Sequence, residues 1–360
     1  MTKVTENQSG WLLRNSLIMT LLLGFALSLA CEHTAQAKPI TIKLATLVPK
    51  GSDYFKVLQD MANDWSRISN GRVKVLLYPG GIVGDETDMV RKMHIGQLQA
   101  AAISTQGLQD IDKSVYALNY PMMVHSWDEL DWLRDHLGET IKNNFHDKGF
   151  TLLFWADVGW VYFFSTRPIL KPQDVKDLKL FTRANDFADL DLWKTAGFNP
   201  VPLTMNDVLP GLQTGLINVV QAPAFIALSS QWFGIANHML DLPWAAMSGG
   251  LVITNDAWSK IPPTLQDTLK KAARHEAQRI HDTIRYHSDD AVDIMKEHGL
   301  IVHEPSEKVK QMWQDETESY YPKFKGVLVS DKMHERLMEL WPKLKAYRQS
   351  KQDSTTQAHD

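Results

Sequence analysis

The chain has 360 residues, of which 44% are hydrophobic and 22% are charged, and its formal net charge is −4. A chain of this length buries a sizeable core and can hold two domains. Its mildly acidic balance gives no electrostatic footprint for nucleic acid, which excludes that partner. Cys31 is the only cysteine, so an internal disulfide is excluded as well.

The first 37 residues are arranged as an export signal. Lys3 and Arg14 supply positive charge, an apolar stretch runs from Leu17 to Ala30, and residues 35–37 form an A-x-A cleavage site. The stretch is shorter than the roughly 18 to 20 apolar residues that a spanning helix needs. We therefore expect cleavage after Ala37, a periplasmic protein and no direct membrane span. Lipid attachment at the nearby cysteine is the alternative.

Strands and helices alternate in the first part of the mature chain. Residues 40–47, 71–80 and 98–105 have the pattern of buried strands, and residues 54–69 and 85–96 have helical spacing. This alternation predicts an α/β fold with a parallel sheet.

A second series of elements begins with an unusually long apolar run. Residues 150–168 (FTLLFWADVGWVYFFSTRP) exceed an ordinary strand, which has about 3 to 10 residues. We predict strands in 178–181, 199–203 and 217–223, a return of the chain to the first domain over 249–263, and helices over 190–196, 208–214, 265–297, 309–321 and 332–350. The polar end, residues 351–360, is predicted to be disordered.

Motifs for catalysis and for cofactors are missing. His275 opens an H-E-A-Q-R run, which lacks the second histidine of the zinc motif H-E-x-x-H. His275, His281 and His287 are spaced six apart, so they do not share one helix face and are interpreted as solvated side chains. We expect no metal, no cofactor and no enzyme. An enzyme of hydrophobic substrates would need a perturbed titratable pair in its ligand site.

The run from Asp174 to Pro223 resembles the second domain of the solute-binding proteins that serve TRAP (tripartite ATP-independent periplasmic) transporters. Residues 45–52, 71–101 and 116–123 resemble first-domain motifs of the same family, in the same order. The resemblance covers Ile40 to about Lys323. It implies a two-domain periplasmic-binding-protein fold (type II-like), with hinge strands and a long bracing helix. It also implies closure around one small molecule and delivery to an ion-gradient-driven permease in the membrane.

The domain limits follow from this resemblance. We expect a signal peptide at 1–37, domain I at 38–160 plus 250–290, and domain II at 161–249 plus 291–350. Residues 351–360 would form the disordered tail.

Four positions depart from the family pattern. In well-known members, two arginines clamp the ligand carboxylate, because a guanidinium pairs with a carboxylate through two hydrogen bonds. Those positions fall on Val161 and Phe181, and the Gln and Asn of the Q-E-N-P motif fall on Val220 and Ala222. A carboxylate beside four apolar side chains would lose its hydration without compensation. The prediction is therefore an apolar or amphiphilic ligand.

Aromatic residues strengthen that prediction. Trp160 and Phe181 border or replace ligand contacts of the family. Tyr162, Phe225, Trp232 and Trp244 lie in segments that face the ligand in the family. For Tyr162, Phe225 and Trp244, ordinary core packing is an equally good interpretation.

Three polar residues leave the ligand class open. Arg183 lies two positions after Phe181, so on a strand it points to the same face. It is either a displaced anion contact or a surface charge at the strand end. Gln106 and Gln221 are either hydrogen-bond partners of the ligand or caps in a loop. Two alternatives follow: an organic-acid receptor of the same transporter class that uses Arg183, or a periplasmic shuttle for a hydrophobic ligand.

Overall fold

A computed structural model describes residues 38–184 and 186–357, without the side chains of 286–289 and 354–357. The predicted export signal, its cleavage site and Cys31 lie outside the described residues. Contacts divide the chain only at Pro39, and Ile40–Asp360 form one compact unit. The predicted limits of two domains within that unit therefore stay a prediction.

Nine strands form one sheet within the described part of the chain. Their order across the sheet is β2 (Val73–Tyr78), β1 (Ile40–Thr46), β3 (Ala100–Ser104), β8 (His238–Thr254), β4 (Phe150–Ser165), β7 (Val219–Pro223), β5 (Lys179–Arg183) and β6 (Asn199–Leu203), and β9 (Ile301–His303) pairs with β8. The α/β class is confirmed.

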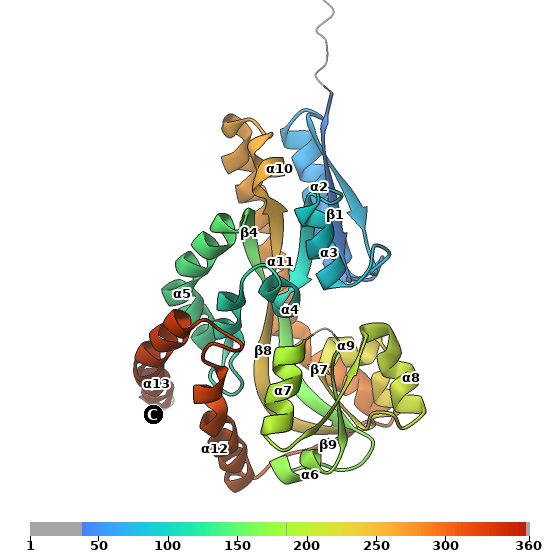
Figure 1. Cartoon of the computed structure of the whole chain (residues 1–360), viewed down its shortest axis with the longest axis vertical. Helices are drawn as coiled ribbons and strands as arrows, with labels where there is room; N and C mark the ends of the chain where they lie inside the picture. The colour runs from blue at the N-terminus through green and yellow to red at the C-terminus, as the bar shows by residue number, and fades with distance from the viewer. Residues whose placement is uncertain (1–37, 185, 358–360) are drawn as a thin grey trace, which may run out of the picture. The chain divides into compact units, whose positions relative to one another are not determined.

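The direction of the strands corrects the expectation of a parallel sheet. β1 is parallel to β2 and β3, and β5 is parallel to β6 and β7. The two central strands differ: β8 is antiparallel to β3 and β4, and β4 is antiparallel to β7. The sheet is mixed because two parallel groups are joined through a pair of long antiparallel strands (Figure 1).

Both central strands are long, with 16 residues in β4 and 17 in β8. β4 is interrupted between Asp157 and Gly159, where its register against β8 shifts. Gly159 has a φ of 140°, and a Cβ there would lie 3.0 Å from the Cβ of Pro223. A β-bulge of this kind bends the strand and changes which side chains face each side of the sheet.

Helices cover the sheet. They are α2 (Asp53–Ile68), α3 (Glu86–His94), α4 (Thr105–Gln109), α5 (Trp127–Asp147), α6 (Pro172–Lys176), α7 (Phe187–Thr195), α8 (Val208–Gln213), α9 (Ala224–Ser229), α10 (Asn255–Ser259), α11 (Pro263–Glu297), α12 (Glu307–Phe324) and α13 (Asp331–Gln357). Short 3₁₀ helices are η1 (Lys113–Asn119), η2 (Met205–Asp207) and η3 (Trp232–Gly234).

The 35-residue helix α11 braces the sheet, as the family resemblance implies. It contacts the central strand β4 and two helices. Of these helices, α2 packs against β2 and α9 packs against β7, so α11 spans different parts of the sheet. Its apolar face packs with Trp65 in one core cluster, and the indole Nε1 of Trp65 donates to the carbonyl of Leu269 at 3.0 Å.

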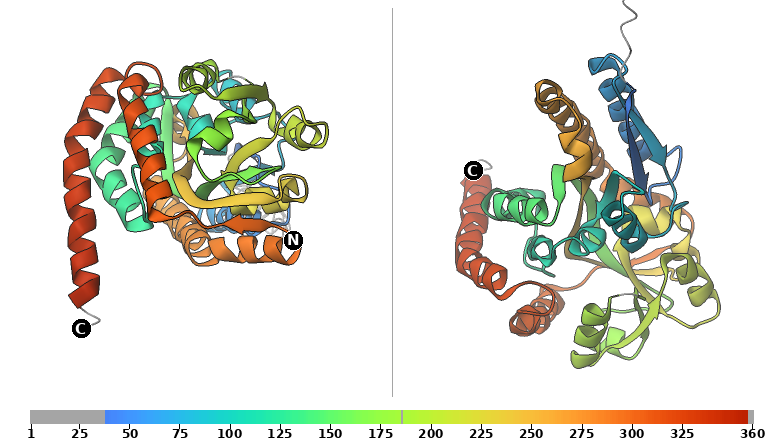
Figure 2. Two further views of the ribbon diagram at one scale, coloured as in Figure 1. Left: turned by 90° about the horizontal axis from the view of Figure 1, so that it is seen from below. Right: turned by 45° about the horizontal axis from the view of Figure 1, so that its top comes forward.

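The chain ends in helices α12 and α13, and α13 packs against α5 (Figures 1 and 2). α13 continues to Gln357, so the prediction of a disordered tail is wrong for residues 351–357. The side chains explain the extension. Arg348 pairs with the buried Glu129 at 2.8 Å, and Lys351 lies 3.3 Å from Asp128.

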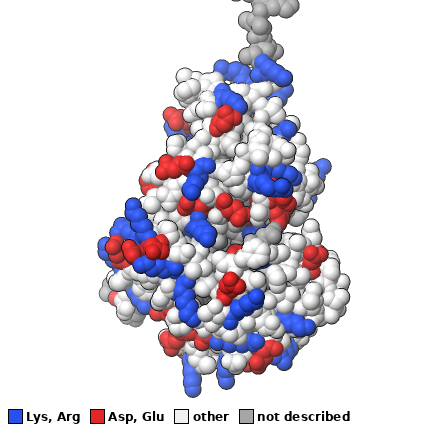
Figure 3. Space-filling model, viewed as in Figure 1, with Lys and Arg blue, Asp and Glu red and all other residues white. Residues whose placement is uncertain are grey.

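Charged side chains of both signs are interspersed on the face of the molecule that Figure 3 shows. Among the described residues, no helix combines the length and the apolar character that a membrane span requires.

Candidate functional site

A cavity of about 630 Å³ lies at the carboxyl ends of four strands. Thr46 and Ser104 line it from the ends of β1 and β3, and Arg183 and Pro223 line it from the ends of β5 and β7. In α/β sheets, ligands bind outside the carboxyl ends of the strands. The central strands bring the ends of the two parallel groups to one site.

The positions of the family arginines form an apolar wall of this cavity. Val161 and Phe181 both line it, with 4% and 5% of their surfaces exposed. Ala222 lines it too, whereas Val220 is fully buried behind it and packs in one cluster with Phe181.

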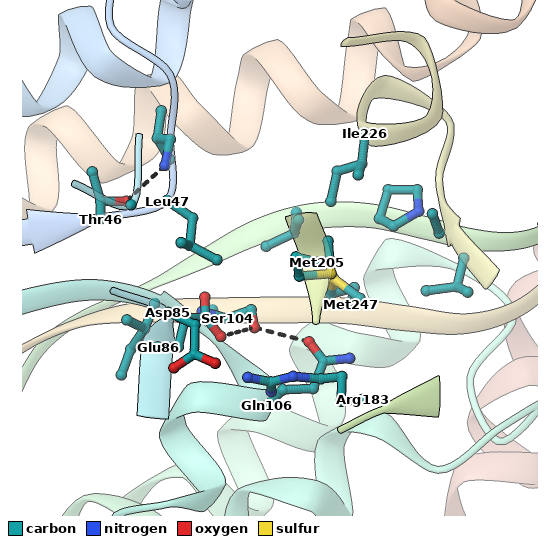
Figure 4. Close-up of a pocket in the computed structure, with 18 of the residues that line it drawn as sticks. Thr46, Leu47, Asp85, Glu86, Ser104, Gln106, Arg183, Met205, Ile226 and Met247 are labelled. Atoms are coloured by element: carbon teal, nitrogen blue, oxygen red, sulfur yellow. Dashed lines mark hydrogen bonds between the residues drawn. The ribbon is translucent and has the colours of Figure 1, made fainter. Parts of the chain in front are cut away.

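Arg183 is the only Lys or Arg among the described residues that line the cavity. It forms no ion pair with a carboxylate of residues 38–184 or 186–357. Figure 4 shows its guanidinium and the amide of Gln106 directed into the same part of the cavity. Its charge is therefore available to a ligand.

Ser104 lies between Gln106 and a buried carboxylate. Glu86 accepts hydrogen bonds from the Ser104 backbone nitrogen at 2.8 Å, the Ser104 hydroxyl at 2.6 Å and the Gly107 nitrogen at 3.0 Å. The Ser104 hydroxyl also lies 2.9 Å from Oε1 of Gln106 (Figure 4). Glu86 is thus a structural group that fixes the start of α4.

Asp189 lines the cavity and has a raised pKa. Burial, together with the neighbouring Asp186, raises the pKa of Asp189 to about 7, against a hydrogen bond from Trp193 and the charge of Arg183. The Trp193 Nε1 donates to its Oδ2 at 3.1 Å. One carboxyl group beside Arg183 is therefore close to half protonated near neutral pH.

Seven of the ten predicted ligand residues line the cavity: Val161, Phe181, Arg183, Ala222, Gln106, Trp232 and Trp244. Trp244 stacks on Trp193 with ring centroids 5.4 Å apart. Phe225 also lines the cavity and stacks on Tyr54. None of these placements tests ligand binding itself.

The other three, Trp160, Tyr162 and Val220, are not among the lining residues. Trp160 packs in the core against Trp127, with ring centroids 4.8 Å apart. Tyr162 packs between two core clusters. The bulge at Gly159 changes which residues of β4 face the cavity, and those that line it are Phe154, Ala156, Val158 and Val161.

Sequence analysis missed several lining residues. They include Met205, Ile226 and Met247, whose side chains Figure 4 shows around the cavity, and the polar residues Asn119 and Thr182, each of which has a buried oxygen atom. Thr182 had a usable signal, because a polar residue inside a buried strand needs a partner.

A buried cluster of charges adjoins the cavity on β4, where Ala156 and Val158 line it. The carboxylate of Asp157 is fully buried and lies 2.7 Å from Nη2 of Arg134, Nδ1 of His281 and Nε of Arg285. Burial alone would raise the pKa of Asp157, but these three neighbours hold it well below its usual range.

His281 corrects an expectation. Its second ring nitrogen lies 3.0 Å from the carbonyl oxygen of Trp155, so the side chain is held on both sides rather than solvated. Among the described residues, no group of three or more His, Cys, Asp or Glu side chains could hold a metal ion.

Comparisons with known proteins agree with this architecture. Curated relatives include the 2,3-diketo-L-gulonate-binding periplasmic protein YiaO of Escherichia coli, 25% identical over 65% of this chain and 72% of the relative. Another is the C4-dicarboxylate-binding periplasmic protein DctP of Rhodobacter capsulatus, 22% identical over 81% of this chain and 88% of the relative.

Solved structures share the fold. A TRAP periplasmic solute-binding protein from Desulfovibrio desulfuricans with bound sn-glycerol-3-phosphate has a TM-score of 0.76 and 19% identity, over 86% of this chain and 97% of that one. The family model for bacterial extracellular solute-binding proteins, family 7 (DctP), matches residues 44–326. This chain belongs to that family, and it is a solute-binding protein of the TRAP class rather than an enzyme.

Proposed function

We propose that this protein is the periplasmic receptor for an amphiphilic organic acid, which it delivers to the membrane permease of a TRAP transporter. Export and cleavage after Ala37 belong to the same proposal. The ligand carboxylate would lie against Arg183, and its apolar body against the wall formed by Val161, Phe181 and Met247.

One observation carries the proposal. Arg183 is an unpaired guanidinium at a cavity in which, among the described residues, no other Lys or Arg is a lining residue. A cation in a largely apolar site is stabilised by an anionic partner, and guanidinium binds carboxylates through paired hydrogen bonds.

The apolar wall limits the choice of acid. Val161 and Phe181 stand where the family resemblance places two clamping arginines, and the site offers Arg183 as a single cation instead. A compact dicarboxylate would leave its second charge beside apolar side chains, which is costly. A monoacid with an apolar body meets both parts of the site.

Related proteins support an anion as the ligand. Their structures were solved with bound succinate, β-D-galacturonate or sn-glycerol-3-phosphate, and each of these molecules carries acidic groups. These ligands were bound by those proteins. In this chain, the apolar side chains at the positions of the clamping arginines favour a more apolar acid.

A first test is native mass spectrometry of the purified mature protein, followed by extraction and identification of any bound molecule. We expect an acid with an apolar body. Arg183→Gln should weaken its binding by about 10 to 100 fold, because hydrogen bonds to charged groups contribute about 1.5–3 kcal/mol. Arg336→Gln, at an exposed site in α13, is the matched control. A ligand without an acidic group, or unchanged binding by Arg183→Gln, would contradict the proposal.

A shuttle for a wholly apolar ligand is the second candidate. Ile82 and Phe187 are 70% and 71% exposed and adjoin the cavity-lining residues Gly81 and Asp186. Exposed apolar residues beside a ligand site are typical of surfaces that dock a partner. Recovery of a neutral, apolar molecule, lost from Phe181→Arg, would favour this candidate.

A further inference from the structure

Buried oxygen atoms without a hydrogen-bond partner mark a second, polar side of the cavity. They are Oδ1 of Asn119, Oγ1 of Thr182 and Oε1 of Gln221, and all three residues line the cavity. Thr182 is only 1% exposed. Buried polar groups in folded proteins are nearly always hydrogen-bonded, so three at one cavity point to a bound partner.

Thr182 and Gln221 lie side by side on neighbouring strands. Leu180 of β5 is paired with Val219 of β7, and the two strands are parallel. Two residues further along each strand, Thr182 and Gln221 come level with each other. Side chains alternate along a strand, so both point to the face that Leu180 and Val219 occupy.

This face is opposite to the one that the family motif uses. Phe181, Val220 and Ala222 point the other way and pack together in one apolar cluster. Thr182 and Gln221 follow Phe181 and Val220 by one residue on each strand. Their side chains lie on the face where Trp193 and Trp244 line the cavity.

The carboxylates that line the cavity already have hydrogen-bond or ion-pair partners within the protein. Glu86 accepts three hydrogen bonds, and Asp88 pairs with Arg91. Asp189 accepts from Trp193, and Asp85 and Asp186 cap helices. The unmet capacity therefore belongs to uncharged oxygens. Two are amide carbonyls, which accept, and the third is a hydroxyl, which accepts or donates, so a hydrogen-bond donor on the ligand can satisfy all three.

We infer that Thr182 and Gln221, with Asn119, form a specificity subsite for a hydroxyl or amine group that the organic acid carries in addition to its carboxylate. The inference rests on the proposed function for the position of the carboxylate at Arg183. The ligand class becomes a hydroxy or amino acid whose apolar part lies against Val161, Phe181 and Met247.

The test uses three probes that differ in one group: 3-phenylpropionate, 3-phenyllactate and phenylalanine. Calorimetric titration of the wild-type protein should give at least about tenfold tighter binding of one of the last two, because a site built for a donor rejects the analogue that lacks it. Which of the two binds tighter identifies the donor as hydroxyl or amine. Binding of all three within about twofold would overturn the subsite.

Variants locate the preference. Thr182→Val keeps the side-chain shape and removes the hydroxyl, and Gln221→Met removes the amide; each should abolish most of the preference while 3-phenylpropionate binds as before. Thr166→Val, on a half-buried residue that does not line the cavity, is the matched control and should retain the preference. A preference that survives both variants would overturn the assignment, and Gln221→Met alone decides it if Thr182→Val does not fold.

Failure of the proposed function gives a different result. Arg183→Gln should weaken all three probes together; if it changes none of them, the carboxylate position is wrong while the donor preference still tests the subsite. If the wild-type protein binds no probe, the molecule extracted from it decides. A hydroxyl or amine beside its acid group supports the subsite, and the absence of both overturns it.

Discussion

The cluster at Asp157 and the cavity at Arg183 hold charged side chains in opposite ways. Asp157 has three positively charged or donating partners at 2.7 Å, whereas Arg183 has no ion-pair partner among the described residues. The two regions are only a few residues apart on β4, since Ala156 and Val158 line the cavity. The comparison separates charges that hold the fold together from a charge that a ligand can use.

The largest expected effect breaks the satisfied cluster. Arg134→Met leaves the buried carboxylate of Asp157 with His281 and Arg285 only. Removing one member of a buried ion pair costs about 3–5 kcal/mol, because the other charge stays desolvated. We expect a loss of that size in the free energy of unfolding, measured with urea at pH 7.

The matched control removes an arginine from the surface. Arg67 pairs with Asp64 at 2.7 Å, but its side chain is 73% exposed. Exposed pairs contribute about 0–1 kcal/mol, so Arg67→Met should change stability little. Equal losses of unfolding free energy in the two variants would show that the Asp157 cluster contributes no more to stability than an exposed ion pair does.

A smaller effect is expected at Gly159, between the two regions. Its φ of 140° is unfavourable for residues with a Cβ, and the Cβ of an alanine would come within 3.0 Å of Pro223. Backbone strain of this kind costs about 1–3 kcal/mol, so Gly159→Ala should lower the free energy of unfolding by that amount. The variant should also disturb ligand affinity, because the bulge sets the direction of Val161.

Gly138 provides the control for that substitution. It lies inside α5, where an added Cβ would meet only the Trp155 indole at an ordinary distance of 3.6 Å. Alanine is favoured over glycine within a helix by about 0.5–1 kcal/mol. Gly138→Ala should therefore be neutral or stabilising, and a loss there as large as at Gly159 would argue against the strain explanation.

Much of the architecture was predictable from the sequence. β6 was predicted with its observed limits, Asn199–Leu203. The family resemblance implied long hinge strands, and the periodicity of residues 265–297 predicted the long helix α11. Local patterns of this kind need no knowledge of distant contacts.

Other features depend on contacts that no local pattern reveals. The partners of His281 on β4 are more than 120 residues away in sequence, so its spacing within the helix suggested only a solvated side chain. Trp160 was placed at the ligand by family alignment, whereas the bulge at Gly159 and the packing against Trp127 hold it in the core. Thr182 gives a local signal as a polar residue in a buried strand, but its place beside Gln221 follows only from the pairing of β5 with β7.

The last prediction concerns pH and refines the comparison at Asp189. Burial and Asp186 raise the pKa of this carboxyl to about 7, above the value of about 3.9 in an unfolded chain. Between these two values the folded protein binds more protons than the unfolded chain, so stability falls as pH rises through this window. The slope for one proton is at most about 1.4 kcal/mol per pH unit.

Asp189→Asn keeps an oxygen for the Trp193 hydrogen bond but cannot ionise. Its stability between pH 5 and pH 8 should therefore be flatter than that of the wild-type protein, with the variant the more stable at pH 8. Parallel curves for the two proteins would mean that Asp189 is charged throughout. The charged carboxylate of Asp189 would then repel the anionic ligand of the proposed function.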